Sequence, residues 1–393
     1  MSKLTKREIP FGRPIIDDAE KKAVAAVLDS PMLVHGPQSK QFEENFAAFT
    51  GAPHALSVAS CTAGLHLAYF YKGIGPGDEV IVPAQTHVAT AHAVEYTGAK
   101  SVFVDAEMVT GNIDIDQIEA AITPRTRAVS VVHYLGMPVN MKRITDIARK
   151  HNLFVVEDCA LALGSYFDGV HAGLHGDIGA FSFYPVKHMT TAEGGMIITR
   201  HTALAEIVNR QKAFGLSKFV GERKIPGVYD VTMLGFNYRM NELEAAIGIE
   251  QLKKVPQFLK KREENYRALE NGLKDIEEIR LFESSNGEYQ SSYYCLSVIL
   301  NKDLARKREE IINLMKEKGV GTSVYYPQPV AHFTYYREKY GYTAEEFPNA
   351  SVISYQSLAL PVGPHLNTED MKYVAEQLKA TIQEVSTHES VTK

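Results

Sequence analysis

Short β-branched segments that alternate with helix-length segments restrict the fold of this chain more than any other feature. The clearest of them are DEVIVP at residue 78, SVFVD at 101, RAVSVVHY at 127 and LFVVED at 153. Strands separated by helices need crossover connections, which are right-handed and place helices on both faces of a mostly parallel sheet. Two further strands, at 179–183 and 195–199, are too close together for a helical crossover, so an irregularity is predicted there. The expected fold class is α/β.

The length of 393 residues allows two or three domains. A long helical pattern covers residues 237–273, and Pro256 inside it is expected to kink or break the helix. A smaller α+β arrangement is predicted after it, from a strand at 291–300, a helix at 301–318, a β segment at 320–326 and a last helix at 367–383. We therefore expect a large domain over 1–250, which begins with a helical segment, and the long helix with a small domain over 251–393.

Composition and charge exclude several classes of function. The net charge of −5 argues against a general binder of nucleic-acid phosphates. No run of about 18 apolar residues occurs, and the N-terminus lacks the apolar segment of a secretion signal. Cys61, Cys159 and Cys295 are far apart and have neither the pattern of a disulfide framework nor the spacing of metal ligands. We expect a cytoplasmic protein that binds no nucleic acid, no membrane and no metal.

Two loops next to predicted strands contain small and polar residues, in the crevice where α/β sheets bind ligands. The first, SCTAG at 60–64, opens a helix, and the backbone N–H groups of a helix start suit an anion. Taken alone, this loop fits a simple N-cap by Ser60 or Thr62 better. The second loop, 83–87, ends in His87, whose ring could stack on a flat ligand, although packing in a loop is the commoner role of a lone histidine.

Two other loops carry ionisable side chains. Glu157 and Asp158 end an apolar strand, where a carboxylate needs a cation or a hydrogen-bond donor; a structural salt bridge is an equal alternative. Ser182 and Lys187 lie near the end of a later strand, before a Gly-Gly turn at 194–195. Most lysines only confer solubility. This one could form a Schiff base if desolvation lowers the pKa of its amine from about 10.4 towards neutrality.

The four loops together match the requirements of pyridoxal phosphate. Its phosphate needs N–H and hydroxyl donors, and its aldehyde needs an amine. A carboxylate keeps the pyridine nitrogen protonated, so that the ring withdraws electrons from a neighbouring carbanion. The composition and spacing of the loops are compatible with this cofactor.

Five ordered segments of the chain resemble the DegT/DnrJ/EryC1/StrS family of sugar aminotransferases, which have the aspartate-aminotransferase fold (fold type I). They are SCTAGLHLA, GIGPGDEVIVPAQTHVATAHAV, VVEDCALALGS, GDIGAFSFYPVKHMTTAEGGMIIT and GFNYRMNELEAAIGIEQLKK. The similarity extends from about residue 8 to 380 and includes YYPQPVAHF and SLALPVGP. The resemblance implies a pyridoxal-phosphate enzyme with a large domain and a small C-terminal domain.

The resemblance also implies roles for individual positions. Lys187 stands where the family has the lysine of the internal aldimine, and Asp158 where it has the partner of the pyridinium nitrogen. Thr62 and Ala63 match the phosphate cradle, and Ser182 adds a hydroxyl group.

Three further positions bear on the cofactor. Asn237 matches an asparagine that reaches the phosphate from the neighbouring subunit, which implies a homodimer with shared active sites. His87 stands where the family usually has Trp, Phe or Tyr over the ring, and an imidazole can still stack. Leu161 replaces a Gln or His near the phenolic oxygen of the cofactor and cannot donate a hydrogen bond, so the oxygen needs another donor.

The family implies amination of a nucleotide-linked keto-sugar, with L-glutamate as the expected donor. Tyr325, Tyr326 and His332 are candidate substrate-side residues, and packing explains each of them equally well.

Two alternatives stay open. A minority branch of the family carries histidine in place of the lysine and acts as a keto-sugar 3-dehydratase, for which His188 would be the base and a substrate-side residue. Counting six residues back from Glu193 places Lys187 at the lysine position, which favours transamination. The second alternative is a non-catalytic regulatory protein on the same fold.

Overall fold

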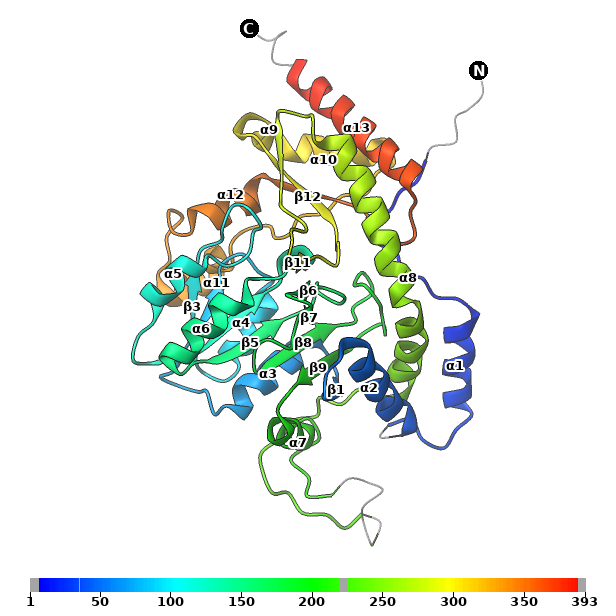
Figure 1. Ribbon diagram of the computed structural model, residues 1–393, viewed down its shortest axis with the longest axis vertical. Coiled ribbons are helices and arrows are strands. Elements are labelled where there is room, and N and C mark those ends of the chain that lie inside the picture. The colour runs from blue at the N-terminus through cyan, green and yellow to red at the C-terminus, as the bar shows by residue number, and fades with distance from the viewer. Residues whose placement is uncertain (1–6, 35, 219–224, 226, 388–393) are drawn as a thin grey trace.

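Seven strands form the central sheet of the computed structural model (Figure 1), in the order β1-β9-β8-β5-β4-β2-β3. The described residues are 7–34, 36–218, 225 and 227–387. The strands are β1 (His54–Val58), β2 (Glu79–Pro83), β3 (Lys100–Val104), β4 (Thr126–Val132), β5 (Phe154–Asp158), β8 (Ile178–Ser182) and β9 (Gly195–Thr199). The neighbours from β3 through to β8 are all parallel, so the α/β prediction is confirmed.

Helices cover both faces of this sheet. They are α2 (Pro37–Thr50), α3 (Cys61–Tyr71), α4 (Val88–Glu95), α5 (Ile115–Ala121), α6 (Met141–His151) and α7 (Thr202–Gln211). α1 (Asp18–Leu28) packs instead against the long helix α8 (Glu242–Leu273). Val80 and Val82 of β2 pack into one core with α3 and α4, whereas Ile81 packs into a separate core with α5 and α6. Successive residues of a strand point to opposite faces, so burial on both sides explains why the strands are apolar throughout.

The irregularity predicted near residue 190 is confirmed. β9 pairs antiparallel with both β8 and β1, in contrast to the parallel strands beside them. Residues 183–194 join β8 to β9 without a helix and pass over the edge of the sheet. Lys187 lies in this connection.

α8, Glu242–Leu273, extends along one side of the molecule (Figure 1). It begins later than expected, because Asn241 caps it in a capping box. A break at Pro256 does not occur, since the helix continues through it. Pro256 is exposed, whereas Val255 and Phe258 beside it are buried. We attribute the continuity to this packing, which outweighs the missing N–H group.

The C-terminal part has an antiparallel sheet in the order β10-β12-β13. Its elements are β10 (Ile279–Leu281), β12 (Leu296–Leu300), α9 (Lys302–Arg306), α10 (Arg308–Glu317), α11 (Thr334–Tyr340), α12 (Pro348–Gln356), β13 (Ser357–Leu360) and α13 (Thr368–Thr387). Lys307 divides the helix expected at 301–318. The β segment expected at 320–326 is wrong, since only single bridges form there, at Val320 and Ser323.

Residues distant in sequence connect the two parts. Near the N-terminus, Ile9 N donates to Gly319 O at 2.8 Å. After β12, Val330 N donates to Ala84 O at 2.9 Å. This hydrogen bond brings the chain back to the carboxyl end of β2 in the large sheet. A third small sheet joins β6 (Tyr166–Phe167), β7 (Val170–His171) and β11 (Tyr289–Gln290). The division at residue 250 stays a prediction, because α8 passes through it.

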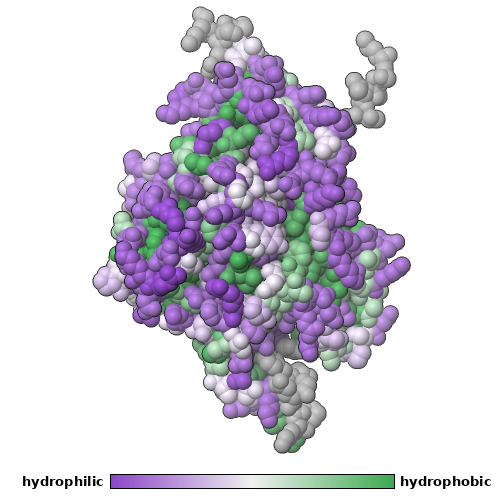
Figure 2. Space-filling model, in the orientation of Figure 1, coloured by the Kyte–Doolittle hydropathy of each residue, from purple (hydrophilic) through white to green (hydrophobic). Residues whose placement is uncertain are grey.

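The surface is mostly hydrophilic on the face shown in Figure 2, with apolar patches between the polar residues. Exposed apolar side chains are frequent on two segments, 16–34 and 214–234. They include Ile16, Leu28, Met32, Leu33, Val34, Phe214, Val228, Tyr229, Val231 and Leu234. The described residues 214–218 and 227–234 of the second segment follow α7 and lie away from the body of the molecule (Figure 1). Within the described part of the chain, no helix combines the length and apolarity needed to cross a membrane.

Candidate active site

Two neighbouring strands bring Asp158 and Lys187 to the same edge of the sheet. Asp158 is the last residue of β5 and pairs in register with Ala180 of β8. β8 ends at Ser182, and Lys187 follows in a turn where its N–H donates to Tyr184 O at 2.9 Å. The carboxyl ends of parallel strands are where α/β sheets bind ligands, and the sequence-predicted pair occupies that edge.

Asp158 is buried, and three groups surround its carboxylate. Thr90 Oγ1 donates to Oδ2 at 2.7 Å, and Ala160 N donates to Oδ1 at 3.0 Å. Cys61 Sγ lies 3.8 Å from Oδ1. These donors stabilise the charged carboxylate, so a buried anion is available to a cationic ring nitrogen.

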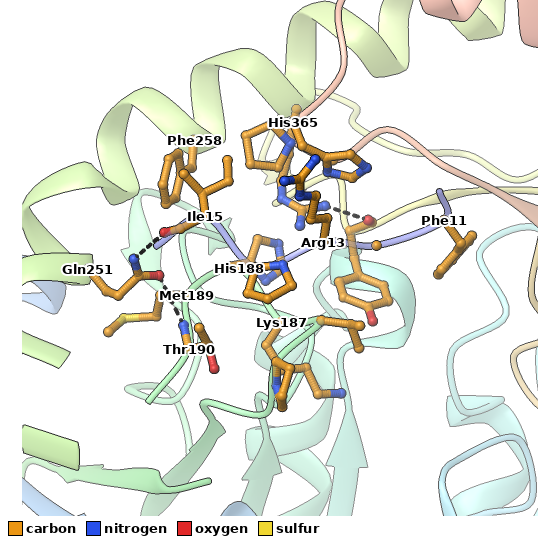
Figure 3. A pocket seen from close by; sticks show the side chains of 18 residues that line it. Phe11, Arg13, Ile15, Lys187, His188, Met189, Thr190, Gln251, Phe258 and His365 are labelled. Atoms are coloured by element: carbon orange, nitrogen blue, oxygen red, sulfur yellow. Dashed lines mark hydrogen bonds between the residues drawn. The ribbon is translucent and has the colours of Figure 1, made fainter. Parts of the chain in front are cut away.

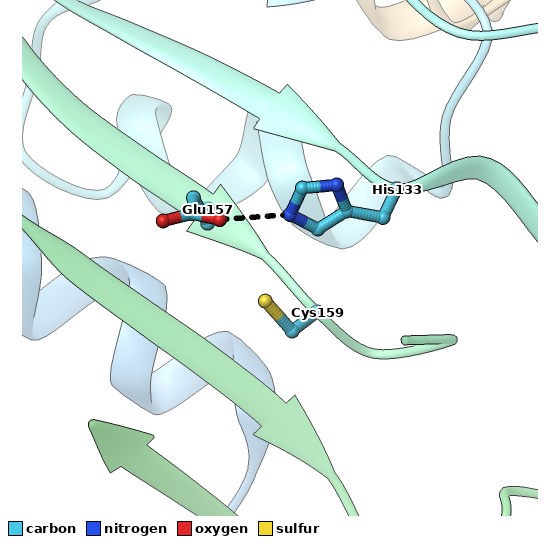
Figure 4. A group of neighbouring side chains, drawn as sticks. All are labelled: His133, Glu157 and Cys159. Atoms are coloured by element: carbon cyan, nitrogen blue, oxygen red, sulfur yellow. Dashed lines mark hydrogen bonds and ion pairs between the residues drawn. The ribbon is translucent and has the colours of Figure 1, made fainter. Parts of the chain in front are cut away.

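Glu157, the preceding residue, points to the opposite face of the sheet, where it is fully buried (Figure 4). Its carboxylate accepts from His133 Nε2 at 2.9 Å and from Gly173 N and Gly176 N at 2.7 and 2.6 Å. Burial alone would raise the pKa of Glu157, but the His133 hydrogen bond and the Gly176 N–H lower it below its usual value.

Cys159 lies beside Glu157 and His133, in an arrangement that resembles a metal-ligand set. His133 Nδ1 accepts from Val139 N at 3.1 Å, so the proton of the neutral ring is on Nε2, which donates to Glu157. Burial raises the pKa of the Cys159 thiol well above its usual value. Both imidazole nitrogens are engaged and the carboxylate has several donors, so this cluster stabilises the sheet. The structural salt bridge considered for the Glu157-Asp158 pair therefore applies to Glu157.

Lys187 is half-buried, and its Nζ lies 5.5 Å from the centre of the Tyr294 ring. Burial lowers the pKa of its amine, while the nearby Cys61 and Asp158 oppose that shift. A lowered pKa increases the fraction of neutral amine, the form that attacks an aldehyde. The amine and the Asp158 carboxylate therefore belong to one site.

The start of α3 lies against β9 at the same edge. A Cβ atom at Gly195 would lie 2.6 Å from Cys61 N, so only glycine allows this approach. Ser60 Oγ accepts from Ala63 N at 3.0 Å, which makes Ser60 the N-cap, as considered from the sequence. The N–H groups of Cys61 and Thr62 come before the first acceptor that a helix can provide. Thr62 is half-buried.

Ser182 is half-buried at the end of β8, and its Oγ accepts from Tyr184 N at 3.4 Å. Ser182, Thr62 and the first N–H groups of α3 could hold a phosphate. With the Asp158 carboxylate and the Lys187 amine, they provide the donor set that pyridoxal phosphate requires, so the residues present fit this cofactor.

His87 caps α4, since its Nδ1 accepts from Ala89 N at 3.2 Å. Its ring keeps an exposed edge and meets the Tyr326 ring edge-on, with 5.6 Å between centres. Loss of hydration and the Lys187 charge lower the pKa of His87, while Asp158 raises it. His87 and Tyr326 thus border the site that contains Lys187 and Asp158.

Tyr325 is held by several hydrogen bonds. Its hydroxyl lies 2.8 Å from the Tyr294 hydroxyl, and its carbonyl accepts from Gln85 Nε2 at 2.9 Å and from the Tyr134 hydroxyl. Tyr294 therefore joins Tyr325 to Lys187, although Tyr294 was not singled out from the sequence. The only feature of the sequence that pointed to Tyr294 was its position in the strand-like segment SSYYCLSVIL at 291–300.

His188 is adjacent to Lys187 but extends in a different direction, and both residues line a small pocket (Figure 3). Its Nε2 donates to Ser292 O at 3.1 Å. Burial, and then the neighbouring Arg262, lower the pKa of His188 well below its usual value. Arg13 and His365 also line this pocket. His188 is thus part of the packing behind the lysine turn.

His332 and Asn237 lie apart from these contacts. His332 is buried, and its Nε2 donates to Glu346 O at 3.1 Å, before α12. Asn237 is exposed and accepts from Arg239 Nε at 3.1 Å. The next residue, Tyr238, accepts from Ala59 N at 2.8 Å, so this segment passes close to the start of α3.

Thr86 and Thr90, like Tyr294, were not identified from the sequence. Their hydroxyl oxygens are 2.7 Å apart, and Thr90 contacts Asp158. Thr86 lies in the loop before α4 and Thr90 in the first turn of that helix, and nothing in the local sequence revealed that Thr90 meets Asp158. Leu161 is buried in the apolar core, and only its backbone carbonyl is engaged, by Ser292 Oγ at 2.8 Å.

Comparison with known proteins points to one family. The model of the DegT/DnrJ/EryC1/StrS aminotransferase family matches residues 14–379. The chain is 38% identical to the spore coat polysaccharide biosynthesis protein SpsC of Bacillus subtilis, over 94% of this chain and 96% of that protein. It is 34% identical to the GDP-perosamine synthase of Escherichia coli O157:H7, over 94% and 97%.

Solved structures also indicate an aminotransferase. Spr1654 of Streptococcus pneumoniae, assigned as a sugar aminotransferase and solved in its PLP form, superposes with a TM-score of 0.90 at 27% identity. The match covers 96% of this chain and all of that one.

Proposed function

The chain belongs to the DegT/DnrJ/EryC1/StrS aminotransferase family and is a pyridoxal-phosphate-dependent aminotransferase, and on that basis we propose that it aminates a nucleotide-linked keto-sugar with L-glutamate as the donor. Two relatives support a nucleotide-linked sugar as the substrate. One is named a GDP-perosamine synthase and the other a spore coat polysaccharide biosynthesis protein. Cys61, Cys159 and Cys295 are free and buried, which fits the reducing cytoplasm as the site of action.

The observation that carries the proposal is that Lys187 and Asp158 lie at the same edge of the sheet. Asp158 ends β5, and Lys187 follows the end of the adjacent strand β8. When bound, the cofactor supplies an electron-withdrawing ring that stabilises a carbanion. Asp158 would hold the proton of the ring nitrogen, as a buried anion with fixed donors. Lys187 Nζ would take the proton from the α-carbon of the donor and return it, which requires a neutral amine. Burial favours that form.

The contacts of His188 favour transamination over dehydration. In the dehydratase alternative, this histidine would be the base at the reacting carbon. Its Nε2 already donates to Ser292 O, and the side chain points away from that of Lys187 (Figure 3). Tyr326, whose ring meets that of His87 at the border of the site, is the best placed of the substrate-side candidates. Tyr325 would act beside it, whereas His332 is buried and lies apart from these contacts.

Addition of L-glutamate to the purified, cofactor-loaded protein is expected to remove the visible absorption of the lysine-bound cofactor and to release 2-oxoglutarate. A keto-sugar carried on GDP, UDP or dTDP should then restore the absorption and yield an amino sugar, which mass spectrometry detects. D-glutamate is the control, since the stereochemistry of proton transfer excludes it. Absorption that persists under excess L-glutamate would contradict glutamate as the donor, and loss of a sugar hydroxyl without amine transfer would indicate the dehydratase.

We also propose a homodimer in which Asn237 of one subunit reaches the phosphate site of the other. The exposed apolar side chains of segments 16–34 and 214–234 support this, because such surfaces commonly mark protein interfaces. Asn237 lies at the end of the second segment and is exposed in the single chain.

Shared sites make a specific prediction for mixed subunits. Lys187→Ala and Asn237→Asp should each inactivate the enzyme, the second by placing a negative charge beside the phosphate. After unfolding and refolding together in equal amounts, half of the dimers should be hybrids with one intact site each, which restores about a quarter of wild-type activity. Mixing either variant with itself is the control. If mass spectrometry detects hybrid dimers but the mixture stays inactive, Lys187 and Asn237 of each active site come from the same subunit, and the shared site is refuted.

A further inference from the structure

We infer that Thr90, supported by Thr86, is a positioning residue for the carboxylate of Asp158. The inference rests on the proposed function. Thr90 Oγ1 lies 2.7 Å from Asp158 Oδ2 and 2.7 Å from Thr86 Oγ1, and all three side chains are buried.

The chemistry of the three groups sets the direction of these hydrogen bonds. An ionised carboxylate only accepts, so the Thr90 hydroxyl donates to Asp158. The single proton of Thr90 is then used, and its oxygen accepts from the Thr86 hydroxyl. The result is a directed chain from Thr86 through Thr90 to Asp158, in which each bond polarises the next.

A structural role within the helix does not account for Thr90. Threonine hydroxyls inside helices usually return to the carbonyl oxygen four residues earlier. Thr50 in α2 does so, with its Oγ1 2.9 Å from Phe46 O. Thr90 in α4 instead directs its hydroxyl out of the helix to a side chain on β5. The hydroxyl therefore acts on Asp158.

The surroundings of the carboxylate make this contact hard to replace. Thr90 is 0% and Thr86 1% exposed, so solvent water does not reach them. The other oxygen of Asp158 is held by Ala160 N at 3.0 Å and lies beside Cys61 Sγ. Donors on both oxygens set the plane of the carboxylate, and Thr90 provides the donor on Oδ2. Loss of the Thr90 hydroxyl would leave Oδ2 without its donor and free the carboxylate to turn.

The test compares Thr90→Val, which has the same shape but no hydroxyl, with Thr90→Ser, which keeps it. For Thr90→Val we expect the dissociation constant of pyridoxal phosphate to rise about tenfold, the loss typical of one hydrogen bond to a charged group. We also expect kcat to fall about tenfold with little change in KM for the donor. Thr90→Ser should stay close to wild type, and Thr86→Val should lie in between.

Thr50→Val is the matched control, because it removes a buried helical hydroxyl remote from the site. It should leave cofactor affinity unchanged. Thr90→Ala repeats the comparison if Thr90→Val does not fold. The inference is overturned if Thr90→Val binds the cofactor as wild type does, or if Thr90→Ser loses as much affinity as Thr90→Val. Cofactor affinity is measured without substrate, so this result is independent of whether the proposed donor and sugar class are correct.

Discussion

Lys187→Ala is expected to lower aminotransferase activity by about 10⁴-fold or more, the upper range for loss of a general acid–base group. The variant loses both the amine that bonds the cofactor and the base that moves the proton. The pKa of that amine is lowered by burial. Activity is followed by coupled detection of 2-oxoglutarate. Borohydride reduction and peptide mapping should find the cofactor on Lys187 in wild type.

His188→Asn is the matched control, since it changes the neighbouring residue and keeps a polar side chain. Its activity should fall far less than that of Lys187→Ala. The opposite order, with Lys187→Ala active and His188→Asn inactive, would support the dehydratase alternative. A borohydride label on another residue would refute the assignment of Lys187, and an unimpaired biological role in Lys187→Ala would favour a regulatory protein.

Asp158→Asn is expected to lower kcat by about 10³-fold, because removing one partner of a buried charge pair costs about 3–5 kcal/mol. The amide cannot hold a positive charge on the ring nitrogen, so the ring withdraws fewer electrons from the reacting carbon. The fold should persist, since the amide nearly matches the carboxylate in shape. Stopped-flow measurement of the half-reaction with L-glutamate isolates this step from sugar binding.

Glu157→Gln makes the same charge change one residue earlier and serves as the control. Glu157 accepts from His133 and from three backbone N–H groups on the other face of the sheet. We expect a lower unfolding temperature but unchanged cofactor affinity and half-reaction rate in the folded protein. Equal kinetic losses in the two variants would show that Asp158 has no specific contact with the cofactor.

This pair of carboxylates also shows how far the sequence could predict the site. The strand LFVVED placed two acidic residues at a sheet edge, and family resemblance selected Asp158. Alternation along β5 sends the two side chains to opposite faces, which agrees with that selection. The partners of Glu157 come from residues 133 and 173–176, and no local pattern identified them.

The helices give a similar lesson. Helix and strand types came from short-range periodicity and were correct for the large sheet. Pro256 has a strong local tendency to interrupt a helix, yet α8 continues, with Val255 and Phe258 buried beside it. The prediction of a β segment at 320–326 was wrong because only two single bridges form there, at Val320 and Ser323. Strand pairing depends on residues far away in the chain, which the local pattern does not reveal.

By itself, the sequence determined the α/β class and the order of the strands along the chain, and it singled out Lys187 and Asp158 as candidates. These depend on local alternation of apolar residues and on short motifs. Only the tertiary structure decided that β9 lies between β1 and β8, that Thr90 reaches Asp158 and that His188 turns away from Lys187. The physical reason is that these contacts join residues separated by tens to hundreds of positions, and packing of whole elements brings them within hydrogen-bonding distance.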